Sequence, residues 1–132
     1  MSWLPEMDIA REGPDAASAR VRVEPDWPWF DGHFPGRPLL PGLGMLALVS
    51  ALAGRAFGPG PWRVRRIDKC RFKGLVRPGE QLEIAVFAGT LEAERLPVRF
   101  ELLREGEPVG AGRLQLGRPA AGQSGAAETE FV

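Results

Sequence analysis

The sequence predicts an α+β domain in which an antiparallel sheet wraps around one long, buried helix. The segment from Leu43 to Ala53 contains no charged residue, so a helix there is apolar on every face. Segments on both sides of it alternate apolar and polar residues with the period of two that is typical of half-buried strands. A helix that must be covered on all faces in a small protein requires the sheet to enclose it.

Before the helix we expect one strand and a long loop. The strand is predicted over Ala19–Glu24, where Val21 and Val23 share one face and charged residues occupy the other. Pro25–Pro38 holds four prolines, two tryptophans and two glycines, a composition that excludes regular structure. Long loops of this kind in small domains are often functional.

The helix itself is predicted over Pro41–Phe57. Proline is well tolerated in the first helical turn, where its missing N–H has no partner to lose. Alanine and leucine, which are strong helix formers, dominate the segment. Gly54 or Gly58 can end the helix.

After the helix, period-two alternation predicts four or five mostly antiparallel strands. The alternating runs are Trp62–Ile67, Leu82–Ala88, Val98–Leu102 and Val109–Leu116. Strict alternation in the first run puts Val64 and Ile67 on opposite faces. Glu105–Pro108 reads as the turn of a hairpin between the last two runs.

The chain length fits one domain. We expect this domain over residues 1–116, followed by a disordered C-terminal tail over residues 117–132, which are rich in Ala, Gly, Ser and Glu. Seventeen basic residues balance seventeen acidic ones. This balance argues against a protein that binds nucleic acid through bulk electrostatics.

The sequence also predicts the cellular compartment and whether a metal or cofactor is needed. Cys70 is the only cysteine and His33 the only histidine, so neither a disulfide framework nor a Cys- or His-rich metal site is expected. Residues 1–10 do not read as a signal peptide, and the apolar run Pro38–Gly54 is too short and too rich in Gly and Pro for a membrane span. We therefore expect a soluble, cytoplasmic protein without metal, cofactor or membrane partner.

The most informative segment is Gly32–Gly42, Gly-His-Phe-Pro-Gly-Arg-Pro-Leu-Leu-Pro-Gly. Histidine has an unperturbed pKa near neutrality, so His33 can serve as a general base. The prolines restrict the loop to few conformations. Gly42 lies at the predicted helix N-terminus, where free backbone N–H groups favour an oxyanion. A packed turn with a close-approach glycine is the alternative reading.

The Gly32–Gly42 segment resembles the Gly-His-Phe-Pro-Gly-x-Pro-x-x-Pro-Gly motif of the hot-dog-fold 3-hydroxyacyl-(acyl carrier protein) dehydratases, and it matches every fixed position. A second stretch is similar too: Ile67–Lys73 contains an aspartate followed by Arg-Phe, and Val76–Glu80 contains a Pro-Gly-acidic turn. The resemblance covers roughly residues 21–116.

This resemblance implies a curved sheet around a central helix and a dimer with active sites at the subunit interface. It implies that His33 abstracts the C2 proton of a 3-hydroxyacyl thioester, with Phe34 beside the substrate. The backbone N–H of Gly42 would hold the thioester oxygen. Water then leaves C3 and gives a trans-2-enoyl thioester, with no cofactor or metal required.

Four cations in the family-like segments are candidates for binding the carrier. They are Arg37, Arg71, Lys73 and Arg77. Because acyl carrier proteins are acidic, a basic rim would steer them toward the site. A solvated strand face is the alternative reading.

The chain departs from the family at one important position. The family has Glu or Asp on the buried helix fourteen positions after the histidine, where this chain has Ala47. No carboxylate occurs from Gly32 to Gly60. Help from a general acid is worth about 10²–10⁴-fold in rate. The chain is similar in this respect to the aryl-polyene-pathway dehydratase-like proteins.

Four explanations for Ala47 stay open. His33 could perform both proton transfers; Asp31 or Asp68 could replace the acid; a partner subunit in a heterodimer could supply it; or the chain could have kept only thioester binding. We favour retained dehydratase chemistry because the His33 loop is intact. A non-catalytic subunit and an acyl thioesterase are the competing functions.

A serine on the helix and the aromatic residues before the motif are further candidates for the site. Ser50 could orient a water on the helix, although a hydroxyl bonded back to the preceding turn is favoured. Trp27, Trp29 and Phe30 could line an acyl tunnel or pack in the core.

Overall fold

The computed structural model describes residues 5–30, 40, 42–57 and 62–118. In chain order its elements are β1 (Asp8–Arg11), β2 (Ala16–Arg22), the 3₁₀ helix η1 (Pro28–Phe30), α1 (Gly42–Ala56), β3 (Arg63–Phe72), β4 (Gln81–Ala88), β5 (Arg95–Arg104) and β6 (Glu107–Gly117).

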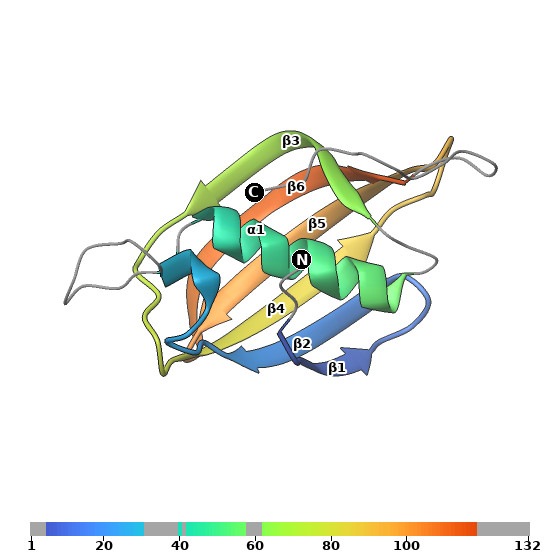
Figure 1. The fold of residues 1–132 in the computed structure, drawn as a ribbon. Coiled ribbons are helices and arrows are strands. Elements are labelled where there is room, and N and C mark those ends of the chain that lie inside the picture. The colour runs from blue at the N-terminus through green and yellow to red at the C-terminus, as the bar shows by residue number, and fades with distance from the viewer. Residues whose placement is uncertain (1–4, 31–39, 41, 58–61, 119–132) are drawn as a thin grey trace.

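The strands form one six-stranded sheet in the order β1-β2-β4-β5-β6-β3, and every neighbouring pair is antiparallel. The sheet curves around α1, which lies along one of its faces (Figure 1). The predicted α+β class is confirmed, and the arrangement is the hot-dog fold that the resemblance implies.

The helix is buried on most of its surface. Leu48, Val49, Leu52 and Ala53 have no exposed surface. Burying one such leucine or valine side chain is worth about 1.5–3 kcal/mol. The prediction of a helix covered on every side fails along one stripe, which is half-buried and consists of Ala47, Ser50, Ala51 and Gly54. Their spacing of three and four residues puts these positions on one helical face.

The N-terminal part of the sheet was only partly predicted. β1 was missed, because four residues with one half-buried position carry no clear alternation. β2 begins at Ala16, earlier than expected, and Ala17 and Ala19 face the core with Val21. Alanine has low strand propensity, so its alternation gave no signal. Val23 is buried as predicted.

β3 corrects the predicted alternation after the helix. The pairing of β3 with β6 shifts register between Val64 and Arg66 and again between Ile67 and Lys69. Each shift marks an extra residue in β3, which is a β-bulge. A bulge changes the face of the sheet on which the following side chains lie. Val64 and Ile67 therefore pair with Leu116 and Leu114, both buried, and share the inner face.

The hairpin between β5 and β6 is confirmed. Its turn is Glu105-Gly106, and both residues have positive φ, 49° and 86°. This is the backbone conformation that two-residue hairpins favour because its twist matches that of the strands. β6 continues to Gly117, and Arg118 forms an ion pair with Glu94 at 2.5 Å. The predicted tail lies almost wholly outside the described residues and stays a prediction.

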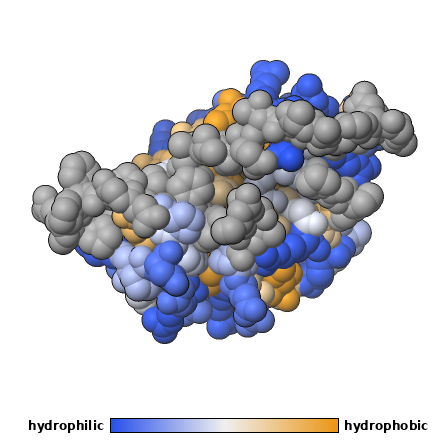
Figure 2. All heavy atoms as spheres, in the orientation of Figure 1, coloured by the Kyte–Doolittle hydropathy of each residue, from blue (hydrophilic) through white to orange (hydrophobic). Residues whose placement is uncertain are grey.

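Seen from the helix side, polar residues surround most of the described rim of the molecule, and apolar surface lies between them in small patches (Figure 2). No helix in the part of the chain that the structure describes is long and apolar enough to cross a membrane.

The close approach of β6 and β3 gives the first prediction. A methyl group on Gly112 would overlap the Lys69 carbonyl oxygen and lie 3.0 Å from both the Cys70 Cα and the Phe100 ring. Gly112→Ala should therefore lower the free energy of unfolding by about 1–3 kcal/mol, as overpacking does.

The matched control is Gly54→Ala. A methyl group there meets nothing within 4 Å, and alanine is the better helix former by about 1 kcal/mol. We expect Gly54→Ala to hold or raise the free energy of unfolding measured by urea denaturation. Equal losses for the two variants would contradict this view of the β3–β6 contact.

Candidate active site

Three of the predicted site residues, His33, Phe34 and Arg37, lie outside the described residues, so their roles stay predictions. The structure does describe the C-terminal end of their segment. The backbone N–H of Leu40 donates to the Val76 carbonyl at 2.8 Å. Leu40 is 4% exposed and Val76 is fully buried. Leu40, near the C-terminal end of the motif, is thus anchored to the segment between β3 and β4 just before α1 begins.

That anchor is itself held by a tight turn at Arg77–Glu80. Gly79 has φ of 92°, and the N–H of Glu80 donates to the Arg77 carbonyl at 3.2 Å, as in a turn with Pro-Gly at its centre. The Glu80 carboxylate accepts a hydrogen bond from the Arg77 N–H at 2.7 Å. The Gly79 N–H donates to the Val23 carbonyl at 2.7 Å. The family-like Pro-Gly-acidic segment is therefore tied to Val23, the residue that follows β2.

Gly42 lies at the helix N-terminus, as predicted; α1 begins at Gly42, one residue after the predicted start at Pro41. Gly42 packs against Phe72 at the end of β3. A methyl group on Gly42 would lie 3.0 Å from Cδ2 of Phe72. On the other side of the ring, a methyl group on Gly110 would lie 2.8 Å from Cδ1. The Phe100 ring stacks on Phe72 at a centroid distance of 6.3 Å. Phe72 thus fixes where the helix N-terminus sits.

Phe72 is the site residue whose role sequence reasoning missed. It was noted as part of the family-like segment, yet nothing in the sequence indicated that it contacts Gly42, thirty positions earlier. The contact accounts for glycine at position 42, because a Cβ there would lie 3.0 Å from the Phe72 ring, and the ring or the helix would have to shift by a few tenths of an ångström. The backbone N–H groups of the first helical turn have no partner within the helix, so a bound oxygen can accept hydrogen bonds from them.

Ala47 belongs to the half-buried stripe of α1, five residues after Gly42. Ser50 lies on the same stripe, and the prediction that it bonds back to the preceding turn is wrong. Its hydroxyl donates to the Trp62 carbonyl at 3.3 Å. The helix therefore presents no acid on this face, and its one hydroxyl already has a structural partner.

Asp68, one of the candidate replacement acids, forms an ion pair with Arg66 at 2.7 Å on β3. This ion pair gives Asp68 a structural role on the strand. Asp31 lies outside the described residues. Cys70 is half-buried on the same strand, and burial raises the pKa of its thiol, so the thiol stays protonated near neutral pH. A half-buried, protonated thiol of this kind packs as a small hydrophobic side chain.

The candidate carrier-binding cations that the structure describes are all exposed. Arg71 lies near the end of β3, and Lys73 and Arg77 lie in the connection to β4. This connection starts beside the N-terminus of α1 (Figure 1). The Lys73 N–H donates to the Val109 carbonyl at 2.8 Å, which fixes the backbone there. The structure thus places three of the four predicted cations at the end of β3 and in the connection that starts beside the helix end carrying Gly42.

The aromatic residues before the motif pack in the core where they are described. Trp27 is 6% exposed, and Phe30 is half-buried against the core. The Trp27 carbonyl accepts the Phe30 N–H at 3.0 Å, which closes η1. Core packing, one of the two predicted roles, therefore accounts for both.

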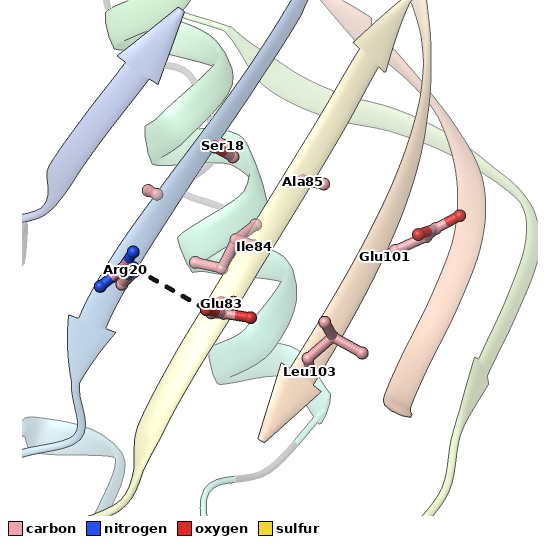
Figure 3. A pocket seen from close by; sticks show the side chains of 8 residues that line it. Ser18, Arg20, Glu83, Ile84, Ala85, Glu101 and Leu103 are labelled. Carbon is pink, nitrogen blue, oxygen red and sulfur yellow. Dashed lines mark ion pairs between the residues drawn. The ribbon is translucent and has the colours of Figure 1, made fainter. Parts of the chain in front are cut away.

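A hollow of about 230 Å³ lies on the opposite face of the sheet from α1. Its lining includes Arg20, Glu83, Glu101 and Leu103, and Arg20 forms an ion pair with Glu83 at 3.8 Å (Figure 3). None of the predicted site residues lines it. The described residues also contain no group of three or more His, Cys, Asp or Glu side chains placed to hold a metal ion.

Comparisons with known proteins agree with this geometry. The family profile of ApeI-like dehydratases, described as ApeI dehydratase, matches residues 10–113. The 3-hydroxyacyl-[acyl-carrier-protein] dehydratase FabZ of Thermoanaerobacter sp. (strain X514) is 36% identical over 87 residues, which cover 61% of this chain and 61% of that protein. FabZ of Oceanobacillus iheyensis is 31% identical over 105 residues, covering 75% and 65%. The match thus spans less than two thirds of these relatives' length.

Solved structures also show similarity to this family. The dehydratase heterocomplex ApeI:P from Xenorhabdus doucetiae superposes with a TM-score of 0.69 at 25% identity, covering 88% of this chain and all of that one. An uncharacterized Erwinia carotovora protein gives 0.65, also at 25% identity, over 88% of this chain and 98% of that one. Since the profile match extends over most of the chain, the protein belongs to the ApeI-like dehydratase family.

Proposed function

We propose that this chain takes part in the dehydration of a 3-hydroxyacyl thioester, carried by acyl carrier protein, to the trans-2-enoyl thioester. The observation that carries the proposal is the placement of Gly42. The helix N-terminus is fixed by Phe72, directly after a segment that matches the dehydratase motif at every fixed position. The FabZ relatives, named as 3-hydroxyacyl-carrier-protein dehydratases, support the substrate class.

In the proposed reaction the thioester oxygen accepts a hydrogen bond from the Gly42 N–H. This bond and the helix dipole stabilise the enolate that forms when His33 removes the C2 proton. The electron pair of the enolate then forms the C2–C3 double bond while the C3–O bond breaks. The C3–O bonding pair leaves with the oxygen, which takes up a proton and departs as water. The base and the oxyanion donor both come from residues 33–42 of one chain.

The proton for the leaving hydroxyl must come from another group, because α1 carries no carboxylate. We propose that a second hot-dog subunit supplies it. The half-buried stripe around Ala47 supports this, since this chain leaves that face of α1 partly uncovered. The ApeI:P structure, titled a dehydratase heterocomplex, supports a partner of a different sequence. A homodimer is the alternative assembly.

The exposed cations Arg71, Lys73 and Arg77, together with Arg37, are proposed to hold the acidic carrier protein at the helix N-terminus. A cytoplasmic location stays a prediction. A non-catalytic subunit is the second candidate function, and the observation that favours it is Ala47. No observation on the described residues favours a thioesterase.

Restoring the acid tests the proposal. Ala47→Glu should raise the rate of dehydration by about 10²–10⁴-fold, the usual worth of a general acid. The assay follows loss of water from a (3R)-3-hydroxyacyl-carrier protein by mass spectrometry, at protein concentrations where subunits pair. Ala47→Gln, of equal size but without an acid, should give no gain.

Adding His33→Ala to Ala47→Glu should abolish the gain and leave the melting curve unchanged. The proposal is wrong if Ala47→Glu and Ala47→Gln dimers are equally inactive on several chain lengths. Release of the free acid in place of the enoyl thioester would instead establish a thioesterase.

The Gly42–Phe72 contact gives a separate prediction in the Ala47→Glu background. Gly42→Ala keeps the backbone N–H but forces a methyl group to 3.0 Å from the Phe72 ring. Complete removal of an oxyanion donor costs about 2.7–4 kcal/mol of transition-state stabilisation. Gly42→Ala displaces the donor without removing it, so we expect kcat to fall by roughly ten-fold or more. Phe72→Leu, added to Gly42→Ala, makes room and should restore part of kcat, whereas no recovery would contradict the positioning role.

A further inference from the structure

Two arginines bind the backbone of the segment between β3 and β4. Arg104, the last residue of β5, donates a hydrogen bond from its guanidinium to the Leu75 carbonyl. Arg22, the last residue of β2, donates one to the Gly79 carbonyl at 2.8 Å. Val76, whose own carbonyl anchors the end of the motif, lies between these two bound carbonyls along the chain. The two contacts therefore enclose the anchor.

Arg104 occupies a position on the inner face of the sheet. The alternate residues before it on β5 are all buried, and they are Leu96, Val98, Phe100 and Leu102. Arg104 continues this row, is half-buried, and pairs with the fully buried Leu82 of β4. A charge at such a position needs a polar partner. The guanidinium finds it by passing Gly74, where an added Cβ would lie 3.8 Å from Nη1, to reach the Leu75 carbonyl.

Arg22 binds the same segment from the opposite face. Val21 and Val23 on either side of it face the core, so Arg22 points outward, paired with the exposed Gln81 of β4. β2 and β5 are the two neighbours of β4 in the sheet (Figure 1). The connection that leads into β4 is therefore held by one arginine from each neighbouring strand, one on each face.

Burial alone fixes only part of this connection. Val76 is fully buried, but Leu75 before it is 47% exposed. Gly74 has φ of 79°, a conformation that glycine adopts without steric cost. An exposed leucine after a glycine does not orient its peptide group by packing, whereas a charge-assisted hydrogen bond to the carbonyl does. Arg104 therefore fixes the peptide that joins Leu75 to Val76, next to the carbonyl that binds Leu40.

We propose that Arg104 and Arg22 are positioning residues for the dehydratase site. Their guanidinium groups hold the β3–β4 connection, and the connection holds Leu40 and the start of α1. The inference rests on the proposed function in one respect, namely that the segment held in this way carries the base and the oxyanion donor. Misplacing reacting groups by about 1 Å can cost roughly 10²-fold in rate. A loosened anchor should therefore slow proton transfer although every reacting group is still present.

The first test is hydrogen exchange of the Leu40 amide, followed by NMR spectroscopy, which needs no substrate. Arg104→Met keeps a long side chain but removes every donor. We expect the Leu40 N–H to exchange roughly three- to ten-fold faster in this variant, the usual worth of one hydrogen bond, while the amides of β4 keep their wild-type rates. Arg104→Lys, whose ammonium can donate to the same carbonyl, should recover part of the protection.

The second test measures kcat and KM for exchange of the C2 proton of a 3-hydroxyacyl-carrier protein in heavy water. Arg104→Met should lower kcat roughly ten-fold and leave KM unchanged, because the reacting groups are misplaced and the binding groups are not. Arg104→Lys should recover part of kcat, and Arg22→Met should act in the same direction as Arg104→Met in both tests. A rise in KM alone would mean that the lost charge only weakens carrier binding, and would overturn the proposal.

Matched controls make the same substitution on the same two strands. Arg95→Met lies at the far end of β5, and Arg20→Met lies two residues before Arg22. Both arginines are exposed, and neither variant should change Leu40 exchange or kcat. Circular dichroism checks that each variant is folded. If Arg104→Met does not fold, Arg104→Lys should show the same losses at smaller size.

The proposal is overturned if Leu40 exchange is unchanged in both the Arg104 and the Arg22 variants, or if a control variant changes it equally. It is also overturned if Leu40 exchange rises while the kcat of an active wild type stays the same. If the wild type exchanges no C2 proton, the proposed function fails, whereas the Leu40 amide still decides whether the two arginines hold the segment.

Discussion

The burial of α1 is the constraint on which the rest of the structure depends. A helix with no charge from Leu43 to Ala53 cannot be left in water, and one six-stranded sheet must curve far enough to cover it. Covering the helix in this way requires close packing between the N-terminus of α1, β3 and β6. Glycines at positions 42, 110 and 112 let α1, β3 and β6 approach so closely that an added Cβ would lie 3.0, 2.8 and 2.3 Å from its nearest neighbour.

The same constraint positions the chemistry. Phe72 is held between Gly110 and Gly42, so the packing of the sheet edge decides where the first turn of α1 presents its N–H groups. The Leu40–Val76 hydrogen bond fixes the residues just before that turn. What the chain does not cover is equally informative: the small-residue stripe through Ala47 and the inner face of Ile67 are left partly open. In the proposed function, a second subunit covers the stripe through Ala47.

The fold class, the buried helix and the β5–β6 hairpin could be predicted from the sequence because each has a strong local signal. β1 and the start of β2 could not, since alanine and short segments alternate without a hydrophobic signature. The bulges in β3 depend on its pairing with β6, so they left no trace in the alternation of β3 itself. The contacts of Ser50 with Trp62 and of Phe72 with Gly42 join distant segments, and no spacing rule reveals them. The motif around His33 was found by resemblance.

The central claim is that this chain keeps the base and the oxyanion donor of a dehydratase and lacks the acid. The most direct test is exchange of the C2 proton of a 3-hydroxyacyl-carrier protein in heavy water, followed by mass spectrometry with the wild-type chain alone. We predict that deuterium enters at C2 faster than with His33→Ala, while little or no enoyl product forms. No exchange above the variant would contradict the retained base and oxyanion site, and rapid conversion to the enoyl thioester would contradict the missing acid.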